Sequence, residues 1–134
     1  MIIESDKKTV ASSIESIFAF LSSCENLYFL LPKDKISNWE ASPLKCEFKI
    51  QGGFIISLEL SDSIENKEIR FKSGYKAAFP FTLSIFISEL SPGISQGHLM
   101  FNAKVSKTIQ LIAEKPLRSL FNTMAENLKS HFEV

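Results

Sequence analysis

The feature that most constrains this chain is a change in the spacing of its apolar residues near residue 106. Over residues 35–106 apolar and polar side chains alternate, as at Phe54, Ile56 and Leu58, which is the pattern of strands with one buried face. Over residues 108–132 the apolar side chains recur every three or four positions, which is typical of a helix with one buried face. The chain therefore predicts a sheet followed by a long helix.

Turn residues divide the alternating region into six strands. Connections this short join antiparallel neighbours, so the six strands are expected to form a meander. An extended segment over residues 4–10 is expected to add a seventh strand at one edge. The predicted turns are Ser42-Pro43, Gln51-Gly52-Gly53, Glu65-Asn66, Gly74 and Ser91-Pro92-Gly93.

Two short helices are expected between the first strand and the meander. Ser12 is followed three residues later by Glu15, and Ser22 by Glu25, a spacing that caps the start of a helix. Pro32 then disfavours helix in the residue before it and is expected to end the second helix.

Pro116 lies inside the final helical pattern. An interior proline costs an unbroken helix about 3 kcal/mol, whereas proline is favourable in a first turn. The sequence therefore predicts a short first helical piece, a kink or break near Lys115, and a main helix that begins at Pro116.

The composition fits one globular domain of the α+β class. The chain has 134 residues, of which 45% are hydrophobic and 22% are charged, and a chain of this length buries roughly two-thirds of its unfolded surface. We expect a single domain over residues 1–134. No run reaches the roughly 20 apolar residues of a membrane span, and no secretory leader pattern is seen, so a cytoplasmic protein without a membrane span is predicted.

Charge and cysteine patterns exclude several classes of partner. Fifteen Lys and Arg balance fifteen Asp and Glu, and no third of the chain holds the basic cluster that nucleic-acid binding needs. Cys24 and Cys46 lack metal-ligand spacing and are interpreted as small buried apolar residues. We expect no nucleic acid, no metal and no cofactor.

Few residues suggest acid–base chemistry. His98 alternates with Leu99 and is expected on the solvent face of its strand. His131 lies in the last turn of the final helix, where a cation complements the helix dipole. Tyr28 and Tyr75 carry the phenolic hydroxyls. The sequence contains no standard catalytic motif, and the predicted inward positions hold no charged residue. Both observations weaken the hypothesis of an enzyme.

Five short segments and the order of the elements carry a resemblance to a known superfamily. The segments are Ser12 to Leu21, Leu31-Pro32, Trp39-Glu40-Ala41, Phe79 to Leu83 and Lys115-Pro116-Leu117. Together they resemble the START-like (SRPBCC) superfamily, which includes birch-pollen-allergen-like and polyketide cyclase-like proteins. The resemblance implies a helix-grip fold, in which a seven-stranded curved antiparallel sheet, with two short helices after its first strand, wraps around a long C-terminal helix.

The resemblance also implies a cavity between the sheet and the C-terminal helix. In many members this cavity holds a lipid, a sterol, a polyketide or another small hydrophobic molecule. Residues 13–31 would act as a lid, and Trp39 and Tyr75 would offer polar contacts at the rim. The apolar walls are expected from Ile56, Phe71, Phe81, Leu83, Phe101, Leu117, Leu120, Phe121 and Met124.

Three functions stay open at this point. The first is a binding protein for a small hydrophobic ligand. The second is a cyclase- or dehydratase-type enzyme in which one tyrosine or histidine moves a proton. The third is a protein-interaction module whose cavity is filled by its own side chains. The twelve phenylalanines suit either an open cavity or a filled core, and exposed edge strands would also allow a homodimer.

Overall fold

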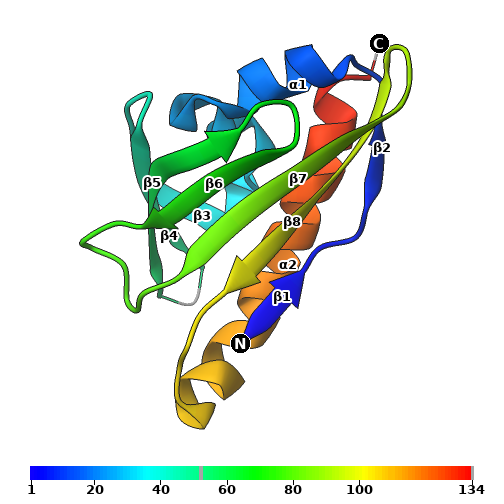
Figure 1. The fold of residues 1–134 in the computed structure, drawn as a ribbon. Coiled ribbons are helices and arrows are strands. Elements are labelled where there is room, and N and C mark those ends of the chain that lie inside the picture. The colour runs from blue at the N-terminus through cyan, green and yellow to red at the C-terminus, as the bar shows by residue number, and fades with distance from the viewer. Residues whose placement is uncertain (52, 134) are drawn as a thin grey trace.

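A computed structural model describes residues 1–51 and 53–133 of the chain, and Figure 1 shows its elements. One antiparallel sheet is packed on one face by a long helix and by shorter helical segments. The elements are β1 (Ile2–Glu4), β2 (Lys8–Val10), α1 (Ile14–Leu21), η1 (Cys24–Leu30), η2 (Lys33–Lys35), β3 (Ile36–Ala41), β4 (Lys45–Ile50), β5 (Ile55–Ile64), β6 (Glu68–Ser73), β7 (Thr82–Ser91), β8 (Ile94–Asn102) and α2 (Lys107–His131).

The strands follow the predicted meander. The order across the sheet is β1-β8-β7-β6-β5-β4-β3, and every neighbouring pair is antiparallel. The expected first strand is split into β1 and β2, which both pair with β8, so the sheet has eight strands rather than the seven predicted. The α+β helix-grip architecture is confirmed.

The split of the first strand has a local cause at Ser5. Its hydroxyl accepts the N–H of Leu99 at 2.8 Å, and its backbone N–H donates to the Leu99 carbonyl. The next backbone N–H, that of Asp6, leaves the sheet and donates to Asn122 Oδ1 on α2. The interruption therefore ties the sheet edge to the long helix.

The first helical cap is one residue later than predicted. Ser13, not Ser12, is the N-cap of α1, and its side chain accepts the N–H of Ser16 at 3.2 Å. The second predicted start, at Ser22, is also wrong. The Ser22 hydroxyl donates to the Phe18 carbonyl at 2.6 Å, which ends α1, and the following segment is a 3₁₀ helix rather than an α-helix.

Of the kink or break predicted near Lys115, the break is wrong. The helix α2 runs without interruption from Lys107 to His131. Ser106 caps its start by accepting the N–H of Ile109 at 3.2 Å. Pro116 has no N–H for the carbonyl of Ile112, but Ile112 is exposed, so that carbonyl is free to bond water. The predicted short first piece and the main helix are therefore one continuous helix.

The alternation correctly predicts which side chains face inward. Cys46, Phe48 and Ile50 are buried on β4, whereas Lys45 and Lys49 between and beside them are exposed. The α2 residues that meet this face are spaced three or four apart, as predicted. They are Ala113, Leu117, Leu120, Phe121, Met124, Ala125 and Leu128. One core cluster therefore joins the inner face of the sheet to α2.

Replacing Pro116 by alanine is predicted to stabilise the protein. The variant Pro116→Ala restores the hydrogen bond to the Ile112 carbonyl and removes the steric penalty of proline, so the free energy of unfolding should rise by about 1–3 kcal/mol. Chemical denaturation would measure it. The control Ser119→Ala, at an exposed position on the same helix, should change it by about 0.5 kcal/mol or less. A less stable Pro116→Ala variant would contradict this account.

Candidate functional site

All of the predicted wall residues are buried in the core of the protein. They come from β5, β6, β7, β8 and α2, except for Phe81, which directly precedes β7, and each is at most 7% exposed. All belong to the core cluster between the sheet and α2. These residues are Ile56, Phe71, Phe81, Leu83, Phe101, Leu117, Leu120, Phe121 and Met124. We call this set the inner wall residues.

Three aromatic rings form the centre of this set. The ring of Phe101 on β8 lies 5.0 Å from that of Phe81 and 5.1 Å from that of Phe121 on α2, measured between centroids. These distances are those of rings in direct contact. The sheet and the long helix therefore touch through their own side chains at the middle of the predicted site.

A small pocket of about 180 Å³ opens at the edge of this interior. It lies where η2, the end of β4 and α2 approach one another. Leu120 belongs both to this pocket and to the inner wall residues. The other lining residues are Pro32, Lys35, Ile50, Gln51, Pro116, Ser119 and Thr123. We call it the edge pocket.

The two predicted rim residues lie in different places. Trp39 is half-buried on β3, where its ring lies 5.4 Å from that of Tyr28 on η1 and 6.0 Å from that of Phe48. It thus lies between the sheet edge and the predicted lid. Tyr75 lies in the β6–β7 connection and is 87% exposed. It belongs to a second pocket, on the opposite face of the sheet.

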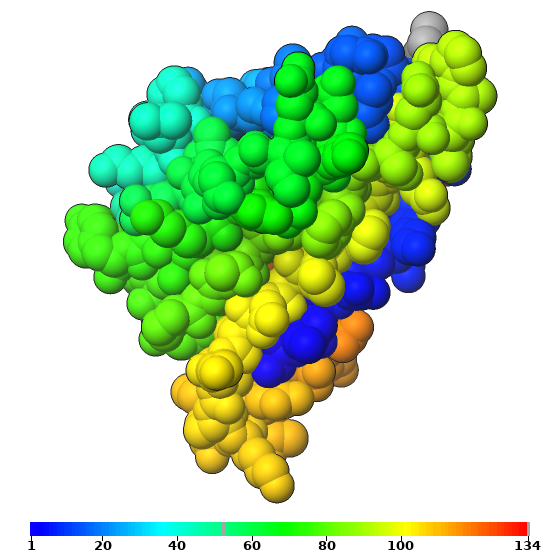
Figure 2. Space-filling model, in the orientation of Figure 1, coloured from blue at the N-terminus to red at the C-terminus, as the bar shows by residue number. Residues whose placement is uncertain are grey.

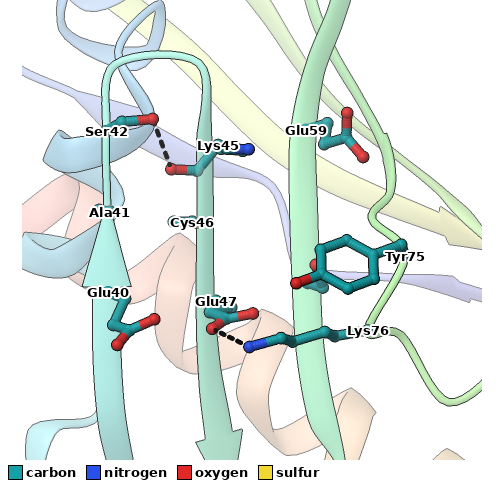
Figure 3. Close-up of a pocket in the computed structure, with 10 residues that line it drawn as sticks. Glu40, Ala41, Ser42, Lys45, Cys46, Glu47, Glu59, Tyr75 and Lys76 are labelled. Atoms are coloured by element: carbon teal, nitrogen blue, oxygen red, sulfur yellow. Dashed lines mark hydrogen bonds and ion pairs between the residues drawn. The ribbon is translucent and has the colours of Figure 1, made fainter.

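Figure 3 shows this second pocket, which has a volume of about 330 Å³. Glu40, Glu47 and Glu59 come from three neighbouring strands, and Tyr75 and Lys76 come from the loop that folds over them. The loop is fixed by the N–H of Gly74, which donates to the Ser57 carbonyl at 2.8 Å. We call the pocket that this loop covers the outer-face pocket.

Charged side chains make up half of the residues that line the outer-face pocket. Lys76 Nζ lies 3.2 Å from Glu47 Oε1. A hydrogen bond with Glu40 and then the ammonium of Lys76 hold the pKa of Glu47 below its ordinary value. Sequence reasoning missed this pocket. The alternation places the three glutamates on one face, but it does not reveal that the loop closes over them.

The proton-transfer candidates lie apart from one another and from the inner wall residues. His98 is on the outer face of β8, stacked on Phe86 with ring centroids 5.3 Å apart. His131 lies at the end of α2, 4.4 Å from the ring of Phe20. Tyr28 is on η1 against Trp39. The structure does not bring these groups to a shared site.

The two cysteines are buried, as the sequence predicts. Cys24 on η1 and Cys46 on β4 are 0% and 3% exposed. A hydrogen bond with Cys24, together with burial, raises the pKa of the Cys46 thiol. The pair lies where η1, the second helical segment of the predicted lid, meets the sheet.

Over residues 1–51 and 53–133, no group of three or more His, Cys, Asp or Glu side chains could hold a metal ion. No helix in that part of the chain is long and apolar enough to cross a membrane.

Comparison with known proteins identifies the fold. No family model and no curated protein matches the sequence. Among solved structures, a START superfamily protein from Mycobacterium smegmatis is 14% identical with a TM-score of 0.68, covering 98% of this chain and 96% of its own. The KanY protein is 12% identical with a TM-score of 0.77, covering 100% and 98%. XoxI from Bacillus cereus is 15% identical with a TM-score of 0.69, covering 98% and 94%. The chain thus has the START-like helix-grip fold.

His98 is predicted to make stability depend on pH. Burial beside Phe86 lowers the pKa of His98 below its ordinary value near 6.5. The unfolded chain therefore binds a proton at His98 more readily than the folded chain does. The free energy of unfolding should fall as the pH drops below about 6.5, the ordinary pKa of histidine. Chemical denaturation at about pH 8 and about pH 5 would show a smaller loss for His98→Gln than for the unmodified protein. An equal loss of unfolding free energy in His98→Gln and in the unmodified protein would contradict a lowered pKa at His98.

Proposed function

We propose that this chain is a cytoplasmic binding protein for a small hydrophobic molecule of the lipid, sterol or polyketide kind, held among the inner wall residues between the sheet and α2. The observation that carries the proposal is the convergence of these residues, from five elements, on one region without a charged group. The START-like fold supports the location, since the resemblance implies a cavity there.

The chemistry of the interior favours an apolar ligand. Within the described chain, the buried polar residues are three serines, Ser5, Ser57 and Ser95. Ser5 and Ser95 already donate to backbone carbonyls through their hydroxyls, and Ser57 faces the outer-face pocket. A charged or strongly polar ligand would find no partner among the inner wall residues, and burying it there would be costly.

Binding requires the central rings to move. A ligand that enters between the sheet and α2 must separate Phe101 from Phe121, whose contact contributes about 0.5–1.5 kcal/mol beyond its buried area. Each buried methylene of a ligand contributes about 0.8 kcal/mol, so a chain of about ten methylenes offsets that contact several times over. Met124 is unbranched and adaptable, which allows the wall to reshape.

The edge pocket supplies the entrance in this proposal. It reaches Leu120 from the surface between η2 and α2. A displaced Leu120 side chain would join the edge pocket to the space beside Phe121 and Met124. The entry route therefore passes between η2 and α2, just beyond the end of the predicted lid at residue 31.

A second candidate function is favoured by the same packing. The contacts between Phe81, Phe101 and Phe121 are those of a filled core, which a protein-interaction module with no internal ligand would show. No observation favours the cyclase or dehydratase alternative, because no titratable side chain lies among the inner wall residues.

A binding experiment separates the two candidates. Native mass spectrometry of the freshly purified protein, followed by solvent extraction, would detect a ligand carried from the cell, and titration with oleate would supply a defined probe. We predict a one-to-one apolar adduct. Bare protein that also fails to take up oleate would contradict the proposal and favour the interaction module.

A narrowed entrance should slow uptake. Ser119 is exposed and lines the edge pocket, so Ser119→Trp should reduce the rate of oleate uptake by about tenfold or more, because a bulky side chain obstructs the route. The matched control is Ser130→Trp, at an exposed position about three turns later on the same helix, which should leave uptake unchanged. Equal rates in both variants would exclude the edge pocket as the entrance.

A further inference from the structure

The first turns of α2 project beyond the sheet. Figure 1 shows the start of this helix extending past the end of β8 and past the N-terminus, and Figure 2 shows the same segment as a protruding end of the molecule. Between Lys107 and Ile112 no side chain is fully buried, and Ala113 is the first α2 residue in the core. We call residues 104–118 the helix tip.

The helix tip exposes two large apolar side chains. Leu111 is 84% exposed and Ile112 is 59% exposed. Successive residues point about 100° apart around a helix, so the two cover adjoining sectors, while Ala113 faces the core. A solvent-facing helix surface is ordinarily polar. These two side chains therefore break the pattern that the rest of α2 follows.

Cations surround the apolar pair. Lys107 and Lys115 lie one turn before and one turn after Leu111, and both are exposed, as is Lys104. None of the three takes part in an ion pair within the described part of the chain. Arg118 pairs with Glu114 at 3.5 Å.

The charge of the helix tip differs from that of the remaining chain. Residues 104–118 contain four basic side chains, Lys104, Lys107, Lys115 and Arg118, against one acidic side chain, Glu114, which gives a net charge of +3. The whole chain is neutral, so the other residues together carry −3. This positive segment contains Leu111, which is the most exposed large aliphatic side chain among residues 1–51 and 53–133.

We propose that the helix tip docks on an anionic lipid surface. Leu111 and Ile112 enter the boundary between headgroups and acyl chains, and Lys104, Lys107 and Lys115 contact the negatively charged headgroups. A helix end that combines large apolar side chains with lysines on adjoining sectors has the chemistry of interfacial membrane binding. This inference does not depend on the proposed internal ligand.

The geometry favours a lipid surface over a protein or a second copy of the chain. A stable protein interface buries about 800 Å² on each partner, whereas the exposed apolar part of the helix tip consists of two side chains on a protruding end. Two copies meeting tip to tip would bring like charges together. A bilayer instead accommodates a convex, cationic end with few apolar contacts.

Vesicle co-sedimentation tests the proposal. The unmodified protein should sediment with vesicles of phosphatidylcholine and phosphatidylserine, and binding should weaken with added salt and be lost with phosphatidylcholine alone. The variant Leu111→Ser/Ile112→Ser should weaken binding about tenfold or more. The variant Lys107→Gln/Lys115→Gln should weaken it about fivefold for each charge removed.

Matched controls keep the result specific to the helix tip. Leu44 and Leu90 are 66% and 54% exposed elsewhere, so Leu44→Ser/Leu90→Ser should sediment like the unmodified protein. Lys49→Gln/Lys72→Gln removes two exposed charges outside the tip and should have less effect than Lys107→Gln/Lys115→Gln. Circular dichroism would confirm that each variant is folded.

Three results would overturn the proposal. The first is no sedimentation of the unmodified protein with anionic vesicles. The second is sedimentation that the tip variants and their controls weaken equally. The third is lipid-independent self-association that Leu111→Ser/Ile112→Ser abolishes, measured by light scattering, which would assign the tip to a second copy. Oleate uptake is measured without vesicles, so a failure of vesicle binding would not contradict the proposed internal ligand, and a failure of oleate uptake would not contradict the proposed membrane docking.

Discussion

The contact between Phe101 and Phe121 is the interaction on which the arrangement of this molecule depends. Phe101 belongs to β8, the strand that pairs with β1, β2 and β7, and Phe121 belongs to the middle of α2. Because their rings meet at 5.1 Å, the sheet is fixed against the helix at the centre of the inner wall residues. Any ligand held between sheet and helix must compete with this pair.

The sequence predicts the sheet well because alternation is a strong local signal. The inward positions of β4 through β8 follow directly from it, and so do the α2 residues that meet them. The helix boundaries were predicted less well, since two serines in succession, Ser12 and Ser13, offer equivalent local caps, and the continuity of α2 through Pro116 depends on where Ile112 lies. The outer-face pocket depends on a long-range bond between Gly74 and Ser57, which no local pattern encodes.

The sequence predicts which residues are buried between the sheet and α2 better than it predicts the shape that they enclose. Alternation and helical spacing say which side chains face one another, but not whether they touch, and here Phe81, Phe101 and Phe121 do touch. The two proposals meet on α2. The edge pocket begins at Pro116, one turn after Ile112 of the helix tip, so a chain docked by its tip would hold the proposed entrance near the lipid surface from which an apolar ligand would come.

The central claim is that an apolar ligand enters among the inner wall residues, and the three methionines of this chain allow a direct test. Met124 is 1% exposed among them, whereas Met100 lies on the outer face of β8 and Met1 at the N-terminus. Protein that is isotopically labelled at the methionine methyl carbons would be titrated with oleate, and its methyl signals would be followed by NMR. The account predicts a large change in the Met124 signal and little change in the signals of Met1 and Met100. A bound oleate that leaves the Met124 signal unchanged would contradict it.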